Sequence, residues 1–223
     1  MQGNETLSLK QAEILKDNLY QILNACNRKI DTANADFLGI MISNWEDQNA
    51  VKYGNVHRKM IDQLYTTISD NYKVFVDVLN EICSAYAKAG GMTSYLPASA
   101  SRHDLYRISN HFKIQDHFGD SDEFGFKDIN SSSEKITQSF TDIIEKYLNQ
   151  AAIDTVEKLK SVNAFGNTKV QLTLAQSAGE IVNIITATIK ELKTFLNNKL
   201  DETKATYKSV GSSAETSAKI SAN

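Results

Sequence analysis

The sequence predicts an all-α protein built from two helical hairpins that pack on each other as an antiparallel four-helix bundle. Two observations favour this class. The 223 residues include one proline, Pro97, and only 10 glycines, so few positions would break a long helix. Apolar residues also recur at steps of three and four over four long segments, which places them along one face of each predicted helix.

The first hairpin is predicted over residues 1–89. Residues 7–43 and 50–88 carry the helical patterns, and a run of turn-forming and capping residues at 44–49 separates them. Gly90 and Gly91 mark the end of the second helix. The two apolar stripes include Leu15, Leu19, Leu23, Cys26 and Ile30 in the first helix, and Ile61, Leu64, Ile68, Phe75 and Leu79 in the second.

The second hairpin is predicted over residues 130–208. Asn130, three serines and Glu134 form a helix start, residues 163–167 interrupt the apolar stripe, and a last helix runs to about Lys208. Between the hairpins, residues 90–129 are expected to be a linker that packs on the bundle and contains a short helix around 100–117. Residues 209–223 lack an apolar stripe and are expected to form a flexible tail.

The two halves match at a constant offset of 121 residues. This shift takes Leu19 to Phe140, past the turn it takes Ile61 to Val182, and at the helix end it takes Tyr86 to Tyr207. Because one offset holds through two helices and the turn between them, we interpret the chain as an internal duplication. Each half would then cover the apolar stripe of the other, so a monomer with an internal pseudo-dimer is expected.

Composition and charge exclude several classes of function. The net charge of −3 provides no general basic face for a nucleic acid. No run of about 18 apolar residues predicts a membrane span, and residues 1–5 do not resemble a secretory signal peptide. Cys26 and Cys83 would lie ~20 Å apart along the first hairpin, so both are expected to be free thiols.

The helix–turn–helix pattern around Trp45 resembles the WXG-100 (ESAT-6-like) family of type VII secretion proteins. The resemblance covers residues 7–88 and 130–208. The family's turn reads Trp-x-Gly; here the turns read Trp45-Glu46-Asp47 and Ala164-Phe165-Gly166, each with part of that motif. The family's export signal is a tyrosine followed four residues later by an acid. Tyr86 and Tyr207 match its tyrosine, but Gly90 and Gly211 stand in place of the acid.

The candidate sites follow from this resemblance. Trp45, Phe165 and Gly166 are the hairpin-turn motif and would contact a partner or simply pack over the hairpin end. Tyr86 and Tyr207 are interpreted as remnants of the secretion signal or as half-buried residues at helix ends. No catalytic, cofactor-binding or metal-binding residues are predicted, since His103, His111 and His117 lack ligand spacing and no nucleophile or phosphate-loop motif is present.

The resemblance implies a non-enzymatic protein that is a substrate or partner of a bacterial type VII secretion system and acts through protein–protein contacts. Its partner would be the secretion machinery or a host protein, and it would leave the cell without a Sec signal or remain cytoplasmic before export. Two alternatives stay open. One is a membrane-active helical toxin, with Ile181–Ile189 as its best candidate segment, although membrane contact is not favoured. The other is a cytoplasmic coiled-coil adaptor.

Overall fold

Four helices pack side by side in the computed structural model, which describes residues 4–46, 48–92, 104–108, 125–126 and 137–221. They are α1 (Leu9–Asn44), α2 (Gln48–Ala89), a helix over residues 137–160, and α6 (Thr168–Ser221). The third helix contains a π-helical turn, η1 (Ile144–Leu148), followed by α5 (Asn149–Lys160). The predicted all-α class is confirmed.

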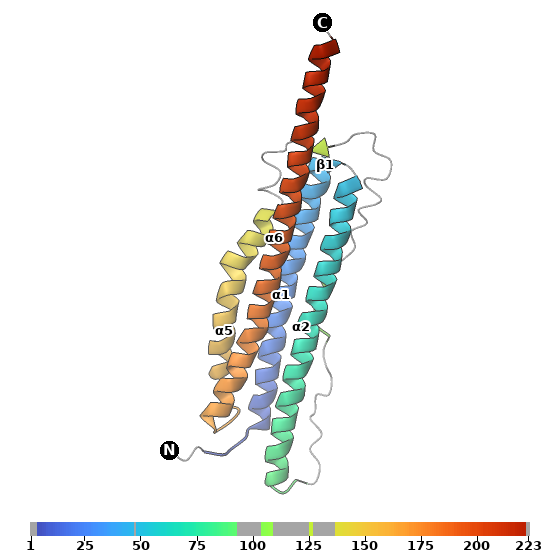
Figure 1. Ribbon diagram of the computed structural model, residues 1–223. Coiled ribbons are helices and arrows are strands. Elements are labelled where there is room, and N and C mark those ends of the chain that lie inside the picture. Colours follow the sequence, from blue (N-terminus) through green and yellow to red (C-terminus); the bar gives the residue numbers. More distant parts are fainter. Residues whose placement is uncertain (1–3, 47, 93–103, 109–124, 127–136, 222–223) are drawn as a thin grey trace.

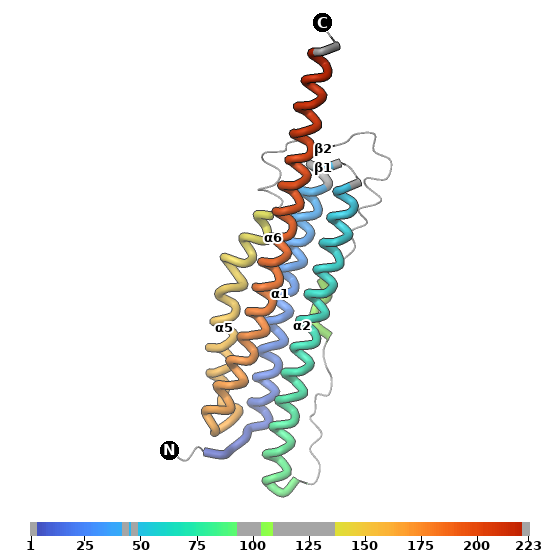
Figure 2. Tube along the Cα trace, in the orientation of Figure 1, coloured from blue at the N-terminus to red at the C-terminus, as the bar shows by residue number. Residues whose placement is uncertain are grey.

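The turns that join α1 to α2 and the third helix to α6 lie at opposite ends of the bundle (Figure 1). The chain leaves the N-terminal end along α1, turns at Trp45 and returns along α2. The helix over residues 137–160 runs back toward the N-terminal end, where residues 161–167 lead into α6 (Figure 2). At the Trp45 end, the two-residue strands β1 (Trp45–Glu46) and β2 (Gly125–Phe126) pair antiparallel, with Trp45 opposite Phe126.

The core consists of one apolar face from each helix. Each buried leucine or isoleucine removes enough apolar surface from water to contribute about 1.5–3 kcal/mol. The side chains that are almost completely buried include Leu15, Leu19, Leu23 and Ile30 of α1, Ile61, Leu64 and Ile68 of α2, Phe140 of the third helix, and Val182, Ile185 and Ile189 of α6. These are the residues that the helical spacing of the sequence selected.

Local sequence explains where the first two helices begin and end. The Ser8 hydroxyl accepts a hydrogen bond from the Gln11 amide at 3.4 Å and caps the start of α1. Gly91 adopts a φ of 86° just after α2, a left-handed conformation that glycine adopts without strain. This turn lets the Met92 amide bond back to the Ala87 carbonyl at 3.0 Å, so the helix stops where the glycine pair indicated.

Two boundaries differ from the expectation. The last helix does not end near Lys208 but continues to Ser221, and residues 208–219 are exposed as a single helix that extends beyond the bundle (Figure 1). In the linker, residues 104–108 are not helical. The rest of the short helix expected around 100–117, and the helix start at Asn130–Glu134, lie outside the described residues.

Candidate functional site

The structure separates the predicted site residues into two groups at the two ends of the bundle. Tyr86, Phe165 and Gly166 come together at the end where α2 stops and α6 begins. Trp45 lies at the opposite end, beside β2. Tyr207 is partly exposed on α6, where that helix begins to leave the bundle.

The turn around Phe165 is held by the N-terminal segment of the chain. The Ser8 amide donates to the Ala164 carbonyl at 2.8 Å, and the Gly166 amide donates to the Thr6 carbonyl at 2.9 Å. Leu7 and Phe165 form an isolated antiparallel bridge between these hydrogen bonds. The Phe165 side chain is 4% exposed, so its ring packs inside this arrangement.

Gly166 is required by this close approach. A Cβ atom at position 166 would overlap the Thr6 hydroxyl and the Asn4 carbonyl oxygen. Both neighbours belong to the segment that crosses the turn, and one of them is backbone. Steric exclusion of any larger side chain therefore explains why glycine occupies position 166 in this fold.

Tyr86 joins the end of α2 to the same turn. Its ring packs against that of Phe165 with the two planes tilted by 55° and the centroids 5.9 Å apart. Its hydroxyl donates to Glu5 Oε2 at 2.7 Å, while Asn167 Nδ2 donates to Glu5 Oε1 at 2.8 Å. The hydrogen bond to Glu5 raises the pKa of Tyr86, with smaller contributions from burial and from the charge of Glu5. Glu5 thus connects the end of the first half to the turn of the second.

An apolar cavity of about 660 Å³ opens beside Tyr86. Leu7 and Leu9 line one side, and Ala85, Ala89 and Met92 line another. Its size falls within the range of small-molecule and peptide sites. The cavity makes this end of the bundle a candidate contact surface, whereas the rings of Phe165 and Tyr86 hold the end together.

Trp45 occupies the opposite end as a buried residue. It is 1% exposed, its amide closes α1 by bonding to the Met41 carbonyl, and its ring lies 5.0 Å from that of Tyr53. The space among its neighbours, which include Leu196 and Leu200, is about 10 Å³, near the lower limit for one water. A partner would therefore meet this turn through the residues around Trp45 and not through the indole itself.

His57 forms a buried polar cluster that the sequence analysis did not single out. The imidazole is 1% exposed and stacks on Phe37 of α1 with ring centroids 4.3 Å apart; Phe140 of the third helix lies at 5.7 Å. Its Nε2 atom meets the Asn34 side-chain oxygen. The available signal was its position: His57 lies four residues before Ile61, in phase with the apolar stripe of α2.

The linker segment 104–108 lies across α1 and α2 and is a second unexpected feature. Leu105 and Ile108 are buried, and the backbone of Tyr106 bonds to side chains of α1. Asn24 Oδ1 accepts from its amide at 2.6 Å, and Asn27 Nδ2 donates to its carbonyl at 2.9 Å. Because these side chains take the backbone groups that a helix would use, the segment stays non-helical.

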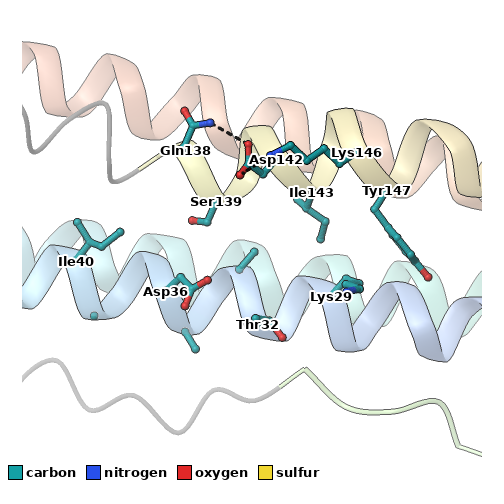
Figure 3. A pocket seen from close by; sticks show the side chains of 13 residues that line it. Lys29, Thr32, Asp36, Ile40, Gln138, Ser139, Asp142, Ile143, Lys146 and Tyr147 are labelled. Carbon is teal, nitrogen blue, oxygen red and sulfur yellow. Dashed lines mark hydrogen bonds and ion pairs between the residues drawn. The ribbon is translucent and has the colours of Figure 1, made fainter.

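Figure 3 shows a groove of about 910 Å³ between α1 and the third helix. Ala33 and Ile143 form its apolar base. Asp142 stands on its wall, where it accepts from Gln138 at 2.9 Å and pairs with Lys146 at 3.2 Å. These contacts lower the pKa of Asp142, the Lys146 contact first. The groove therefore combines an apolar base with a charged rim, as surfaces that bind protein segments do.

The described ranges contain no cluster of three or more His, Cys, Asp or Glu side chains placed to hold a metal ion. Of the linker residues weighed for such a site, His103, His111 and His117 lie outside those ranges. Among the helices that the structure describes, none has an apolar stretch long enough to cross a membrane. Comparisons of the chain with known protein families, with curated proteins and with solved structures found no match.

Proposed function

We propose that this chain is a non-enzymatic, ESAT-6-like protein that serves as a substrate or partner of a bacterial type VII secretion system. It acts through protein–protein contacts, and its two halves are two antiparallel hairpins that pair within one chain as an internal pseudo-dimer. In this proposal the duplication replaces the second subunit that single-hairpin relatives recruit, so the bundle itself needs no second copy. The proposal rests on the sequence resemblance and on one observation about the paired halves.

The observation that carries the proposal is the contact between Tyr86 and Phe165. The sequence resemblance singled out one residue at the helix end of the first half and one in the turn of the second half. Their rings lie 5.9 Å apart although they are far apart in sequence. A pairing in which each half closes over the turn of the other accounts for this contact and for the opposite positions of the two turns.

The C-terminal arm, defined as residues 208–221 of α6, supports the same proposal. Tyr207 lies at its base, and the arm is exposed through Lys219. An exposed helix with a tyrosine at its base is accessible to a large protein partner without any change in the bundle. We infer that Tyr207, at the base of this exposed arm, is the tyrosine that a secretion partner would recognise.

The test is secretion from a bacterium that has an active type VII system. The intact chain should appear in the culture supernatant of that strain and not in that of an isogenic strain without the secretion ATPase, with a cytoplasmic enzyme as the lysis marker. Tyr207→Ala should reduce export. Val210→Ala is the matched control on the same arm, since Val210 is 60% exposed and occupies a position of the signal pattern at which any residue is accepted. Equal supernatant levels from the two strains would contradict the proposal.

The cytoplasmic adaptor remains the second candidate because of one specific feature. Both tyrosines are followed four residues later by glycine, Gly90 and Gly211, where the family's export signal has an acid. A chain without that acid would stay in the cell or leave with a partner that supplies the signal. Recovery of the chain from the cytoplasm in complex with a secreted protein would favour the adaptor.

A further inference from the structure

Among the described residues, His57 is the one titratable imidazole placed in the bundle core. It projects from α2 into the seam where α1 and the third helix meet, between Phe37 and Phe140. Both phenylalanines are almost completely buried, so the surroundings of the imidazole on these two sides are apolar. A neutral imidazole fits such a site, whereas a charged one would be surrounded by apolar rings and one amide.

The hydrogen bonding of the ring shows which form the site accepts. The Asn34 side-chain oxygen accepts from Nε2, so that nitrogen carries the proton of the neutral ring. The other nitrogen, Nδ1, is buried and has no hydrogen-bond partner among the described residues. A second proton would therefore sit on Nδ1 without an acceptor, and the ring would carry an unpaired charge in the core.

Within the described ranges, no carboxylate forms a hydrogen bond with the imidazole that would compensate such a charge. Burial lowers the pKa of His57 from 6.5 to about 3. The described titratable groups on the helices around it have other partners or are exposed. On α1, Asp31 accepts from Tyr106 and Asp36 is exposed, and on the third helix Asp142 pairs with Lys146. On α6, Lys199 pairs with Glu202 and Lys193 is half-buried, and on α2 itself Arg58 and Lys59 are exposed.

We propose that His57 makes the packing at this seam sensitive to acid. Uptake of a proton by its imidazole opens the Trp45 end of the bundle. The groove of about 910 Å³ separates α1 from the third helix on its outer side, and the hydrogen-bond pattern of the third helix changes to a π turn along the same stretch. This inference does not depend on the proposed role in secretion.

The direction of the pH dependence follows from the two protonation states. The folded chain binds the proton more weakly than the unfolded chain, so the stability contributed by neutral His57 is complete above about pH 6.5. It is lost as the pH falls from 6.5 toward 3, because the unfolded chain is protonated first. Proton linkage between these values lowers the ratio of folded to unfolded protein by about 30-fold at pH 5 and about 300-fold at pH 4.

The test compares the full-length chain with His57→Phe, which keeps a ring against Phe37 but has no titratable nitrogen. Trp45 is the only tryptophan, so its fluorescence follows unfolding in urea at the end of the bundle that the proposal expects to open. Between pH 7.5 and pH 5, the folded-to-unfolded ratio of the wild type should fall about 30-fold more than that of His57→Phe. Carboxylates that titrate in the same range affect both proteins equally. An equal fall in the two proteins would overturn the proposal.

Two further measurements keep the test decisive if His57→Phe folds poorly. Asn34→Asp places a carboxylate beside the imidazole, which should raise the pKa of His57 and shrink the loss of stability between pH 7.5 and pH 5. In the wild type, the NMR signal of the His57 ring should not titrate above pH 5 while the protein stays folded. A folded-state titration near pH 6.5, or an Asn34→Asp variant with an undiminished loss, would overturn the proposal.

Discussion

Tyr86 and Asn167 bind the two oxygens of one carboxylate, that of Glu5, at 2.7 and 2.8 Å. The three residues belong to the end of α2, the start of α6 and the N-terminal segment, which are far apart along the chain. Glu5 therefore fixes the position of the Phe165 turn relative to α2. The N-terminal segment of the chain is consequently part of the bundle, and its crossing of the turn sets strict limits on which side chains fit there.

Gly166→Ala should destabilise the protein because of that crossing. The added methyl group would overlap the Thr6 hydroxyl and the backbone of Asn4, so the N-terminal segment must move and lose its hydrogen bonds to the turn. We expect a loss of about 1–3 kcal/mol in the free energy of unfolding, measured in urea.

Gly39→Ala is the matched control for this change. A Cβ at position 39, within α1, meets nothing within 4 Å. Alanine there should raise the free energy of unfolding by about 0.5–1 kcal/mol, because glycine loses more backbone entropy in a helix. If both variants changed the free energy of unfolding in the same direction and by the same amount, the close approach at Gly166 would not explain the effect of Gly166→Ala.

The segment 104–108 gives a second prediction. Asn24→Ala removes the acceptor for the Tyr106 amide and should cost about 1–3 kcal/mol in the free energy of unfolding. The Tyr106 amide hydrogen should then exchange faster with solvent, as measured by NMR. Thr32→Ala is the control, since the Thr32 hydroxyl donates to the Arg28 carbonyl of its own helix at an exposed position. Unchanged exchange at Tyr106 in Asn24→Ala would show that other contacts hold the segment.

The sequence predicted the helices well and the contacts between distant segments poorly. Spacing alone selected Leu19, Leu23 and Ile61 as core residues, because helical periodicity is a local property. It placed the end of the last helix near Lys208, because the apolar stripe ends there, although the helix continues to Ser221. A helix in the exposed arm requires only backbone hydrogen bonds. It buries no apolar face, so the spacing of apolar residues in the sequence cannot detect it.

The candidate site was predicted in part for the same reason. Motif spacing singled out Tyr86 and Phe165, but nothing in a single sequence joins them to Glu5, whose partners lie 81 and 162 residues away. The non-helical course of residues 104–108 depends on Asn24 and Asn27, which are equally remote. Such contacts depend on how the helices pack, and local propensity does not encode helix packing.

The cysteines should be unreactive in the folded protein. The structure confirms Cys26 and Cys83 as buried free thiols. Burial raises the pKa of Cys26 to about 12 and that of Cys83 to about 11, with the charge of Glu13 adding to the effect at Cys83. Since the thiolate is the reactive form, a disulfide reagent at pH 8 should label neither cysteine in buffer and both in concentrated urea. Rapid labelling of either thiol in buffer would contradict the packing described for α1 and α2.

The secretion proposal leads to one gain-of-function prediction. Gly211 lies four residues after Tyr207, on the exposed arm, and a Cβ at this position meets nothing within 4 Å. Gly211→Glu would therefore complete the tyrosine-to-acid spacing of the family's export signal without disturbing the bundle, and it should increase export through a type VII system several-fold. The measurement is the ratio of supernatant to cell-bound protein in a secreting strain and in its ATPase-deficient counterpart.

Gly211→Gln is the control variant. It distinguishes the effect of adding a carboxylate from the effect of replacing glycine with a residue that favours helix. Both variants should stabilise the helical arm to a similar extent, because glutamate and glutamine have similar helix propensities. Only the glutamate supplies a negative charge one turn beyond Tyr207, so only Gly211→Glu should gain export. If the two variants left the cell equally well, the gain would come from a stiffer arm, and Tyr207 would have to be abandoned as part of a charged export signal.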